Sequence, residues 1–352
     1  MIKHLTLHLT DACNLNCEYC HVAAIRNTSN TSGIISDHDL MKLFPESVYS
    51  VSVAGGEPFL DKQRLYHLLD LIPSTIQSVA VTTNGTLLED RDFDILKSKH
   101  VRIQFSIDGK KKNHEENRGE HTYDLLQGNI DKAIFNGLRV DLLTTIGNSS
   151  LDSIVSFVKE LDKDGIDNIT LLHFTPKGRG KAHGSEEVDD IEWFEFVTTI
   201  GKKLNNQYTR VWIQPRFLTE PLVKQCNLVR DITFCNCFDP RYAYVDLTTG
   251  KVYPCGLSFG TPICFGNISD SSMRTINDVV KNNEKFVIPQ ECSDCQKLPF
   301  CKGGAKCYSW LEAHDFNRKD PRCEGNSLLP ICPFPAIIVS GPSMQTKQPT
   351  IV

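Results

Sequence analysis

The stretch TDACNLNCEYC at residues 10–20 carries three cysteines with the spacing C-x3-C-x2-C. It directly follows His4–Thr10, in which leucine stands at every second position, the pattern of a half-buried strand. The residues between the cysteines are mostly polar, which favours a loop over a packed element. The sequence therefore predicts that the thiols of Cys13, Cys17 and Cys20 lie at the carboxyl end of a first strand.

Three interpretations of these thiols remain open from the spacing alone. Positions i, i+4 and i+7 share one face of a helix, so the thiols would also suit a core. A structural zinc site needs a fourth ligand, and His21 is adjacent to the last cysteine rather than well spaced from it. Three thiolates on a 4Fe–4S cluster leave one iron without a protein ligand, and chemistry requires such an open site. The polar surroundings favour the cluster.

Beyond this loop the chain alternates strand-like and helical patterns up to about residue 215. The expected strands are His4–Thr10, Val48–Ala54, Ser78–Thr83, Val101–Asp108, Arg139–Ile146 and Asn168–Thr175. The expected helices are Asp61–Ile72, Asp90–Ser98, Asp124–Asn136, Leu151–Lys163 and Asp190–Asn206. Six such units with short connections predict an α/β fold with a parallel sheet, either open and doubly wound or an incomplete barrel. In both cases ligands bind at the carboxyl ends of the strands.

Composition excludes several classes of protein. A net charge of −5 and a pI near 6.1 disfavour a nucleic-acid partner, which would require a basic face. No apolar stretch reaches the roughly 20 residues that span a bilayer. The amino terminus lacks the apolar segment of a signal peptide. We therefore expect a cytoplasmic protein with no membrane partner.

The fourteen cysteines need an explanation other than disulfides, which are rare in a reducing cytoplasm. Three lie within the first 20 residues, none falls between Cys20 and Cys226, and eleven crowd into the last third of the chain. Scattered core thiols would not cluster in this way. The distribution favours metal or cluster ligation at two places.

Three further segments stand at successive predicted strand ends: GGEP at 55–58, TTNG at 82–85 and SIDG at 106–109. Together with the cysteine loop, they resemble the signature of the radical S-adenosylmethionine (SAM) superfamily. The resemblance implies a partial (β/α)6 TIM-like barrel and a SAM-binding 4Fe–4S cluster on Cys13, Cys17 and Cys20. It also implies reductive cleavage of SAM to a 5′-deoxyadenosyl radical that abstracts hydrogen from a substrate.

The same resemblance implies a set of cofactor-binding residues. The backbone of the GGE segment would bind the methionyl amino group, and glycine allows that close approach. Arg118, in a stretch similar to an H-[DE]-x-x-R motif, would pair with a carboxylate, although a surface arginine is an equal alternative. Asp108 is also a catalytic candidate. The full set is Tyr19, Gly55, Gly56, Glu57, Asn84, Ser106, Asp108 and Arg118.

A second cysteine-rich region begins after about residue 220. Cys237, Gly250 and Cys255 have the spacing C-x12-G-x4-C, residues 292–301 read C-x2-C-x5-C, and Cys323 follows. A pair of zinc ribbons would fit this spacing equally well. With the expected hairpin at 249–255, the pattern resembles the SPASM extension, which holds two auxiliary iron–sulfur clusters. The resemblance assigns one 4Fe–4S cluster to Cys292, Cys295, Cys301 and Cys323.

The chain departs from that pattern at Ala305, where a cysteine is expected. Cys307 matches the second cysteine of a G-G-C-x-C variant, so the other cluster would use Cys237, Cys255 and Cys307, with Cys235 as the candidate fourth ligand. This cluster would be 4Fe–4S, 2Fe–2S, open at one iron, or absent. The remaining thiols are expected to be inert core residues, or one of them, with Cys226 as the candidate, returns hydrogen to a substrate radical. They are Cys226, Cys264 and Cys332.

We expect three parts: a barrel at 1–220, a SPASM-like domain at 221–335 and a flexible tail at 336–352. The predicted function is radical modification of a peptide or protein side chain, by crosslinking, oxidation or other maturation. Two alternatives are a radical oxidoreductase or epimerase acting on a small molecule, and a metal-stabilised binding module without activity. The segment PKGRG at 176–180 resembles one found in several SPASM branches and does not choose between substrates.

Partners follow from the same reasoning. The first strand begins almost at Met1, which leaves no room ahead of it for the leader-binding domain of many peptide-modifying relatives. We therefore expect either a separate leader-binding protein or direct binding of a peptide to the barrel. The chemistry also requires an electron donor such as flavodoxin or ferredoxin.

Overall fold

The computed structural model describes residues 1–22, 25–26, 35–147, 151–186, 188–214, 216–219, 235, 237–238, 241–281, 287–323, 328–330, 337–342 and 350–351. Cys226 and Cys332 lie outside the described residues, so the expectations for these two thiols stay predictions. No described helix combines the length and the apolar character that crossing a membrane requires.

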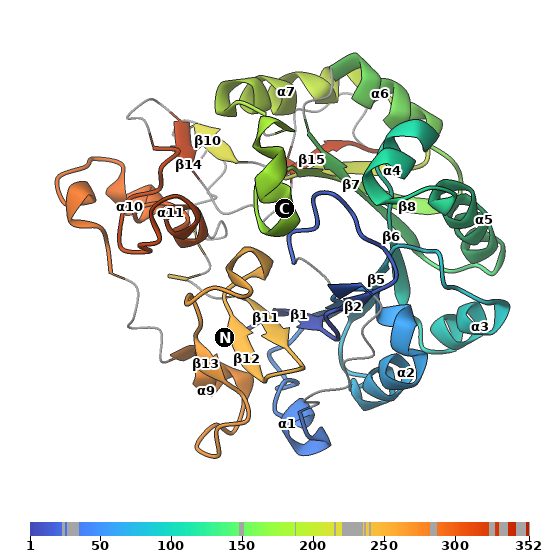
Figure 1. Cartoon of the computed structure of the whole chain (residues 1–352), viewed down its shortest axis with the longest axis horizontal. Helices are drawn as coiled ribbons and strands as arrows, with labels where there is room; N and C mark the ends of the chain where they lie inside the picture. Colours follow the sequence, from blue (N-terminus) through green and yellow to red (C-terminus); the bar gives the residue numbers. More distant parts are fainter. Residues whose placement is uncertain are drawn as a thin grey trace.

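One sheet of twelve strands organises the fold, in the order β13-β12-β11-β1-β4-β5-β6-β7-β8-β9-β15-β16. The six strands expected from the sequence form its centre and pair in parallel. They are β1 (His4–His8), β4 (Ser50–Ala54), β5 (Ser78–Thr83), β6 (Arg102–Ser106), β7 (Val140–Ile146) and β8 (Ile166–His173). The sheet curves around a centre with helices outside it, so the α/β fold is an incomplete barrel (Figure 1).

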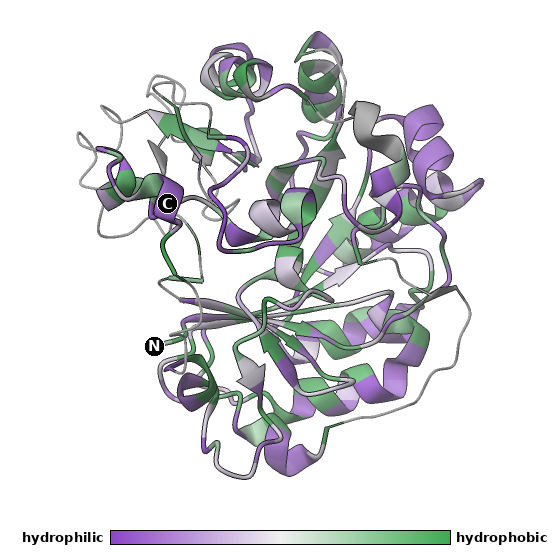
Figure 2. Cartoon of the chain, turned by 60° about the vertical axis from the view of Figure 1, so that its left-hand side comes forward, coloured by the Kyte–Doolittle hydropathy of each residue, from purple (hydrophilic) through white to green (hydrophobic). Residues whose placement is uncertain are grey.

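Alternation along each strand separates an apolar face from a polar one. In β4, Val51 and Val53 are buried in the core, while Ser52 between them lines an inner cavity. Ile103 in β6 is likewise buried, and Gln104 next to it lines the cavity. Hydrophobic residues accordingly concentrate on the strands and on the helix faces turned towards them (Figure 2). The period of two that predicts these strands therefore also produces a polar interior.

Helices cover the outer face of this sheet (Figure 1). Those expected from the sequence are α2 (Lys62–Leu71), α3 (Asp90–Ser98), α5 (Thr122–Phe135), α6 (Leu151–Glu160) and α7 (Asp190–Lys203). Two of them begin at capping residues: Asp61 accepts a hydrogen bond from the Arg64 N–H at the start of α2, and Glu89 with Asp92 forms a capping box at the start of α3. Two helices were not expected, α1 (Asp37–Met41) and α4 (Lys111–Arg118). Both are short and polar, so their sequences carry little amphipathic signal.

Segments from beyond residue 206 extend the sheet at both edges. On one side β9 (Arg210–Ile213) is followed by β15 (Ile337–Ser340) and β16 (Thr350–Ile351). On the other, β11 (Tyr242–Asp246) pairs in parallel with β1 and continues into β12 (Lys251–Tyr253) and β13 (Gly266–Asn267). The expected hairpin at 249–255 is therefore present. The sheet crosses the expected boundary at 220, and part of the expected tail forms strands that cover the edge of β9.

Short elements complete the described chain. The cysteine loop contributes β2 (Ala12–Cys13), paired with β3 (Ile25–Arg26), and β10 (Phe217–Thr219) pairs with β14 (Leu328–Pro330). The 3-10 segments are η1 (Pro58–Asp61), η2 (Gly178–Glu186), η4 (Gly256–Ser258) and η5 (Gln290–Cys292). The later helices are α9 (Ile276–Lys281), α10 (Leu298–Cys301) and α11 (Lys306–Ala313). In Figure 1, α10 and α11 lie across the molecule from α2 and α3.

Candidate active site

A cavity of about 590 Å³ lies inside the curve of the sheet and reaches the carboxyl ends of its strands. Ligands bind at this end of a barrel because the loops that follow the strands meet there. Ten of the residues predicted from the sequence line it: Cys13, Cys17, Tyr19, Cys20, Gly55, Gly56, Asn84, Ser106, Arg118 and Cys255. The cavity therefore joins the first cysteine loop to the cysteine-rich C-terminal region.

Two distant segments hold the cysteine loop in place. Arg179 donates from Nε to the carbonyl of Cys17 over 2.9 Å, and its backbone N–H donates to the carbonyl of Cys20 over 3.1 Å. The N–H of Glu18 donates to the carbonyl of Asn117, at the end of α4, over 3.0 Å. The sequence identifies the PKGRG segment only by resemblance. In the structure it clamps the loop that carries the three thiols.

The two glycines at the end of β4 are required by the chain's own packing. A Cβ on Gly56 would lie 2.1 Å from the carbonyl oxygen of Ala12, and one on Gly55 would lie 2.6 Å from that of Thr10. The N–H of Gly56 also donates to the Thr10 carbonyl over 2.6 Å. Any side chain here would push the cysteine loop away from β4. From the sequence, these glycines are expected because a ligand must come close to the backbone. The structure shows that the cysteine loop also comes close to them.

Glu57 is a buried link between two strand ends. Only 1% of the residue is exposed, and burial raises the pKa of its carboxyl group despite the hydrogen bonds it accepts. One carboxylate oxygen accepts from the Thr83 hydroxyl over 2.7 Å, and the other accepts from the Asn84 N–H over 2.8 Å. The side chain therefore joins the end of β4 to the end of β5. Its predicted part in cofactor binding rests on its backbone and on the position it gives Asn84.

The first three thiols fit an iron–sulfur cluster in chemistry and in surroundings. Burial raises the pKa of Cys13 to about 12, and the neighbouring Glu57, Cys17 and Cys20 act in the same direction. Three adjacent thiolates in this cavity would repel one another, so a bound cationic group is needed to hold them deprotonated. Each thiolate of a four-iron cluster binds a different iron, so the sulfurs need not converge on one point. No three His, Cys, Asp or Glu side chains in the described ranges converge as a single metal ion would require.

Tyr19, Asp108 and Arg118 form one network beside the cysteine loop. The Tyr19 hydroxyl and the Arg118 Nε both donate to the same carboxylate oxygen of Asp108, and the other oxygen accepts from the Thr145 N–H over 3.2 Å. The Arg118 guanidinium lies 5.8 Å from the centre of the Tyr19 ring. Although burial alone would lower it, the Asp108 carboxylate raises the pKa of Arg118. Arg118 is therefore a fixed buried cation at the cavity wall rather than a surface arginine.

The later cysteines gather in two groups. Burial and the thiols of Cys235, Cys255 and Cys307 all raise the pKa of Cys237; we call these four cysteines the inner group. Burial and the thiols of Cys301, Cys323 and Cys295 raise the pKa of Cys292, and these four form the outer group. The two sets are those that the resemblance assigns to two clusters. Cys264 lies apart from both and donates to the carbonyls of Val252 and Gly266.

Ala305 occupies the position where a cysteine was expected. It is fully buried, and its N–H donates to an Asp320 carboxylate oxygen over 2.7 Å. The preceding Gly303 and Gly304 have φ of +85° and +79°, which turns the chain sharply into α11 and brings Cys307 to the inner group. The described structure thus supplies four thiols to this group without a cysteine at 305.

Lys177 is a buried residue that the sequence argument did not single out. Its Nζ donates to the carbonyls of Gly256 and Phe259 over 3.1 and 2.7 Å. Burial lowers the pKa of Lys177 to about 8, against the opposing effect of the Cys255 and Cys307 thiols. It therefore fixes the turn after Cys255 against the segment that follows β8. Its place in the PKGRG segment, two residues before Arg179, is the signal that points to it in the sequence.

A chain of side chains connects the cavity to α11. His173, at the end of β8, lines the cavity, and its Nε2 lies 2.7 Å from the hydroxyl oxygen of Tyr308. The Arg322 guanidinium stacks 3.8 Å from the centre of the Tyr308 ring. Burial, with the cations Arg216 and Arg322, lowers the pKa of His173 well below its usual range. A neutral imidazole is thus held at the cavity wall.

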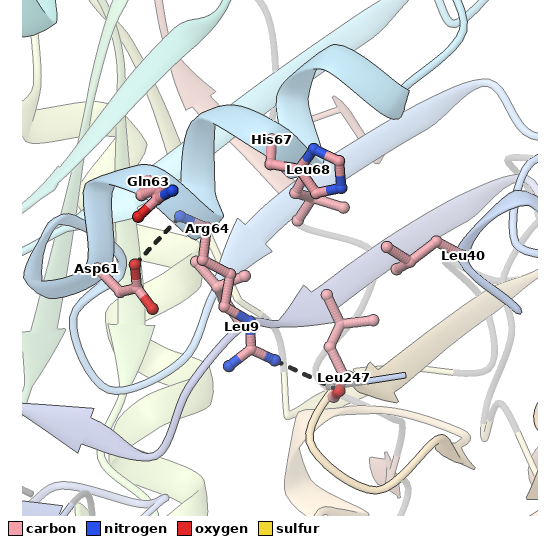
Figure 3. Close-up of a pocket in the computed structure, with 8 residues that line it drawn as sticks. All are labelled: Leu9, Leu40, Asp61, Gln63, Arg64, His67, Leu68 and Leu247. Atoms are coloured by element: carbon pink, nitrogen blue, oxygen red, sulfur yellow. Dashed lines mark hydrogen bonds between the residues drawn. The ribbon is translucent and has the colours of Figure 1, made fainter. Parts of the chain in front are cut away.

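A second, smaller cavity of about 260 Å³ lies away from these groups, between α2 and the turn after β11 (Figure 3). Arg64 crosses it and donates to the carbonyl of Leu247 over 3.4 Å. The other residues around it include Leu9, Leu40 and Leu68. None of the predicted site residues lines this cavity.

This chain is similar in sequence to known proteins. Residues 7–171 match the model of the radical SAM superfamily. A cysteine-type anaerobic sulfatase-maturating enzyme of Clostridium perfringens is 25% identical over 338 residues, covering 84% of this chain and 86% of that protein. A probable GTP 3',8-cyclase of Sulfurisphaera tokodaii is 28% identical over 236 residues, covering 63% of this chain and 71% of that protein.

The fold is also similar to a solved structure, SuiB of Streptococcus suis. The crystal structure of SuiB bound to S-adenosylmethionine superposes with a TM-score of 0.65 at 17% identity, covering 92% of this chain and 77% of that one. SuiB bound to its precursor peptide SuiA gives a TM-score of 0.65 at 18% identity. At this level of identity the likeness shows the fold alone. It extends over the C-terminal cysteine region as well as the barrel.

Proposed function

The chain is an enzyme of the radical SAM superfamily, and on that premise we propose that it modifies a side chain of a peptide or protein. One observation carries the proposal: Cys255 of the inner group lines the same cavity as the first three cysteines. A substrate in this cavity would lie between two clusters. The one on the first three cysteines would start the reaction, and the one on the inner group would accept an electron from the substrate. Such an arrangement suits a net oxidation or a crosslink.

A 4Fe–4S cluster and SAM are the cofactors of the reaction. We assign the cluster to Cys13, Cys17 and Cys20 and the SAM site to the adjoining cavity wall. When bound and reduced, the cluster supplies the electron that cleaves SAM to a 5′-deoxyadenosyl radical, which removes a hydrogen atom from the substrate. The inner and outer groups would each hold one auxiliary iron–sulfur cluster.

The residues of the chain orient these groups and exclude water. Gly55 and Gly56 bring the cysteine loop close against β4, and Arg179 fixes its carbonyls. Asp108 holds Tyr19 and Arg118 in one orientation at the wall, where the guanidinium is ready to pair with a carboxylate of SAM or substrate. Asn84 and Ser106 line the same wall and offer hydrogen bonds to a ribose.

The relatives favour a peptide or protein over a nucleotide as substrate. The sulfatase-maturating enzyme aligns with 84% of the chain, whereas the probable GTP 3',8-cyclase aligns with 63%. An alignment that covers 84% of the chain must include part of the cysteine-rich region after residue 220, where the inner group lies. A small-molecule substrate remains the second candidate because the cyclase has the higher identity over the part that it covers.

The experiment uses anaerobically reconstituted full-length protein with SAM and a reductant, either dithionite or a flavodoxin system. We expect about twelve irons per chain, 5′-deoxyadenosine on reduction, and a faster yield of it when the right peptide is added. Candidate peptides come from short open reading frames beside the gene, with and without a separate leader-binding protein. Loss of two hydrogens from a peptide would support the proposal. Consumption of GTP with no change in any peptide would contradict it, as would zinc without iron.

A further inference from the structure

Lys306, the first residue of α11, is buried in a way that needs explanation. None of the residue is exposed, and its Nζ finds no hydrogen-bond partner among the described residues. The ammonium lies 5.2 Å from the centre of the Phe238 ring, which is a weak partner for a full charge. A buried ammonium without a hydrogen bond or a countercharge is strongly unfavourable. Burial lowers the pKa of Lys306, so the ammonium persists only where its surroundings carry the opposite charge.

The nearby carboxylate of Asp320 supplies only the smallest part of that charge. Asp320 is bound by Arg322 through two hydrogen bonds, of 2.9 Å from Nε and 2.6 Å from Nη2. Its Oδ2 also accepts from the Ala305 N–H. The charge of Asp320 is thus neutralised by a guanidinium that is itself buried. It leaves little to compensate a second cation.

The other neighbours of Lys306 are thiols from both cysteine groups. Cys235 and Cys237 of the inner group and Cys292 of the outer group all interact electrostatically with its ammonium. The backbone N–H of Lys306 also donates to the sulfur of Cys235. As thiolates these cysteines would provide the missing negative charge. The ammonium of Lys306 has no hydrogen-bond partner among the described residues, and it interacts with thiols of both the inner and the outer group. Anionic clusters on these thiols would compensate its charge.

We propose that Lys306 is a countercharge shared by the inner and outer groups, which raises the reduction potential of the iron–sulfur clusters they hold. The inference rests on the auxiliary clusters of the proposed function. Reduction adds negative charge to a cluster, and a fixed cation nearby stabilises the reduced form. One ammonium between two clusters acts on both. Lys306 is a positioning charge and not a catalytic residue.

The test compares reduction potentials of full-length reconstituted protein, followed by electron paramagnetic resonance during a redox titration. The variants are Lys306→Gln, which removes the charge, and Lys306→Arg, which keeps it. Lys302→Gln is the matched control, because Lys302 is an exposed lysine in the turn before α11. The signal that changes on addition of SAM marks the first cluster and serves as an internal reference.

We expect Lys306→Gln to lower the ratio of reduced to oxidised auxiliary cluster about tenfold at a fixed potential, a shift of about 59 mV for a one-electron couple. The potentials of the auxiliary clusters in Lys302→Gln and Lys306→Arg should stay close to those of wild type. The potential of the first cluster should not change in any of the variants. Equal potentials in Lys306→Gln and Lys302→Gln would overturn the inference. If Lys306→Gln loses auxiliary iron, retention of that iron by Lys306→Arg supports a role of charge, and loss in both contradicts it.

Iron content separates this inference from the proposed function. Wild-type protein with only about four irons would overturn the auxiliary clusters and the role of Lys306 together. About twelve irons with unmoved potentials in Lys306→Gln would overturn the role of Lys306 alone.

Discussion

Asp108 and Arg118 form an ion pair that is closed off from solvent, with 2% and 11% of the two side chains exposed. Because the Tyr19 hydroxyl donates to the same carboxylate, the pair joins the end of β6, helix α4 and the cysteine loop. Three predicted cofactor-binding residues from three separate segments of the chain therefore contact one another directly.

Replacing Asp108 with Asn should leave the charge of Arg118 buried without its partner. We expect a loss of about 3–5 kcal/mol in the free energy of unfolding, measured by urea denaturation. The matched control is Asp124→Asn, because the Lys111–Asp124 pair is 51% and 67% exposed and should contribute little to stability. Similar losses in the two variants would show that the Asp108 pair is not a buried one.

Replacing Gly56 with Ala should displace the cysteine loop, because the added Cβ would meet the Ala12 carbonyl oxygen at 2.1 Å. We expect loss of the first cluster and of SAM cleavage, measured by iron content and 5′-deoxyadenosine yield. Gly128→Ala in α5 is the control, since nothing lies within 4 Å of a Cβ there. That variant should gain about 0.5–1 kcal/mol of stability from helix propensity. Full SAM cleavage by Gly56→Ala would refute the packing argument.

Replacing Cys17 with Ala should abolish formation of 5′-deoxyadenosine and remove about four irons per chain. Cys264→Ala provides the comparison, because that thiol lies outside both cysteine groups and bonds only backbone carbonyls among its described contacts. It should keep its iron and its SAM cleavage. Undiminished cleavage by Cys17→Ala would remove the basis for assigning the first cluster to this loop.

Asp162 should give the protein a pH-dependent part of its stability. Its carboxylate accepts hydrogen bonds from the N–H groups of Gln207, Tyr208 and Thr209 over 2.6, 3.0 and 2.9 Å. Burial acts to raise its pKa, but these bonds and that of the Thr209 hydroxyl outweigh it and lower the pKa below 3.8. Because the folded pKa is depressed, the stabilisation is present above the unfolded pKa and is lost as the pH falls through the folded one.

The measurement compares wild type with Asp162→Asn. At pH 7 we expect wild type to be more stable by about 1 kcal/mol, because these hydrogen bonds are exposed or only partly buried and solvent weakens them. The difference should shrink steadily as the pH is lowered to about 3. A difference that is constant across this range would mean that the charge of Asp162 does not stabilise the fold.

Much of the fold was predictable because local patterns determine it. The six central strands follow from apolar residues at every second position, and α3 has the bounds that its sequence predicts. The strand β9 (Arg210–Ile213) was missed because four residues give too short a pattern to distinguish from a loop. The pairing of β11 with β1 depends on contacts across most of the chain, which no local pattern encodes.

The candidate site was likewise predictable from the sequence only in part. The resemblance assigns Cys307, in place of a cysteine at 305, to the same set as Cys237, and the Cys307 thiol contributes to raising the pKa of Cys237. Cysteine spacing did not predict the buried lysines, Lys177 and Lys306, because their importance comes from carbonyls and thiols distant in sequence. The pair formed by His173 and Tyr308, 135 residues apart, was likewise invisible. The spacing of cysteines in the sequence indicates candidate ligands, whereas the charged groups around them are brought together only by folding.

The place of β1 in the sheet has a consequence for how the protein is made. Tyr244 of β11 lies 2.7 Å from His8 of β1 although 236 residues separate them. A ribosome that adds about 5–20 residues per second needs roughly 10–50 s to reach this partner after the first strand has emerged. During that time the nascent barrel has β4 beside β1 but leaves the other edge of β1 unpaired. The first strand is thus among the last to have both of its edges paired, and until then one edge is open to pairing with another chain.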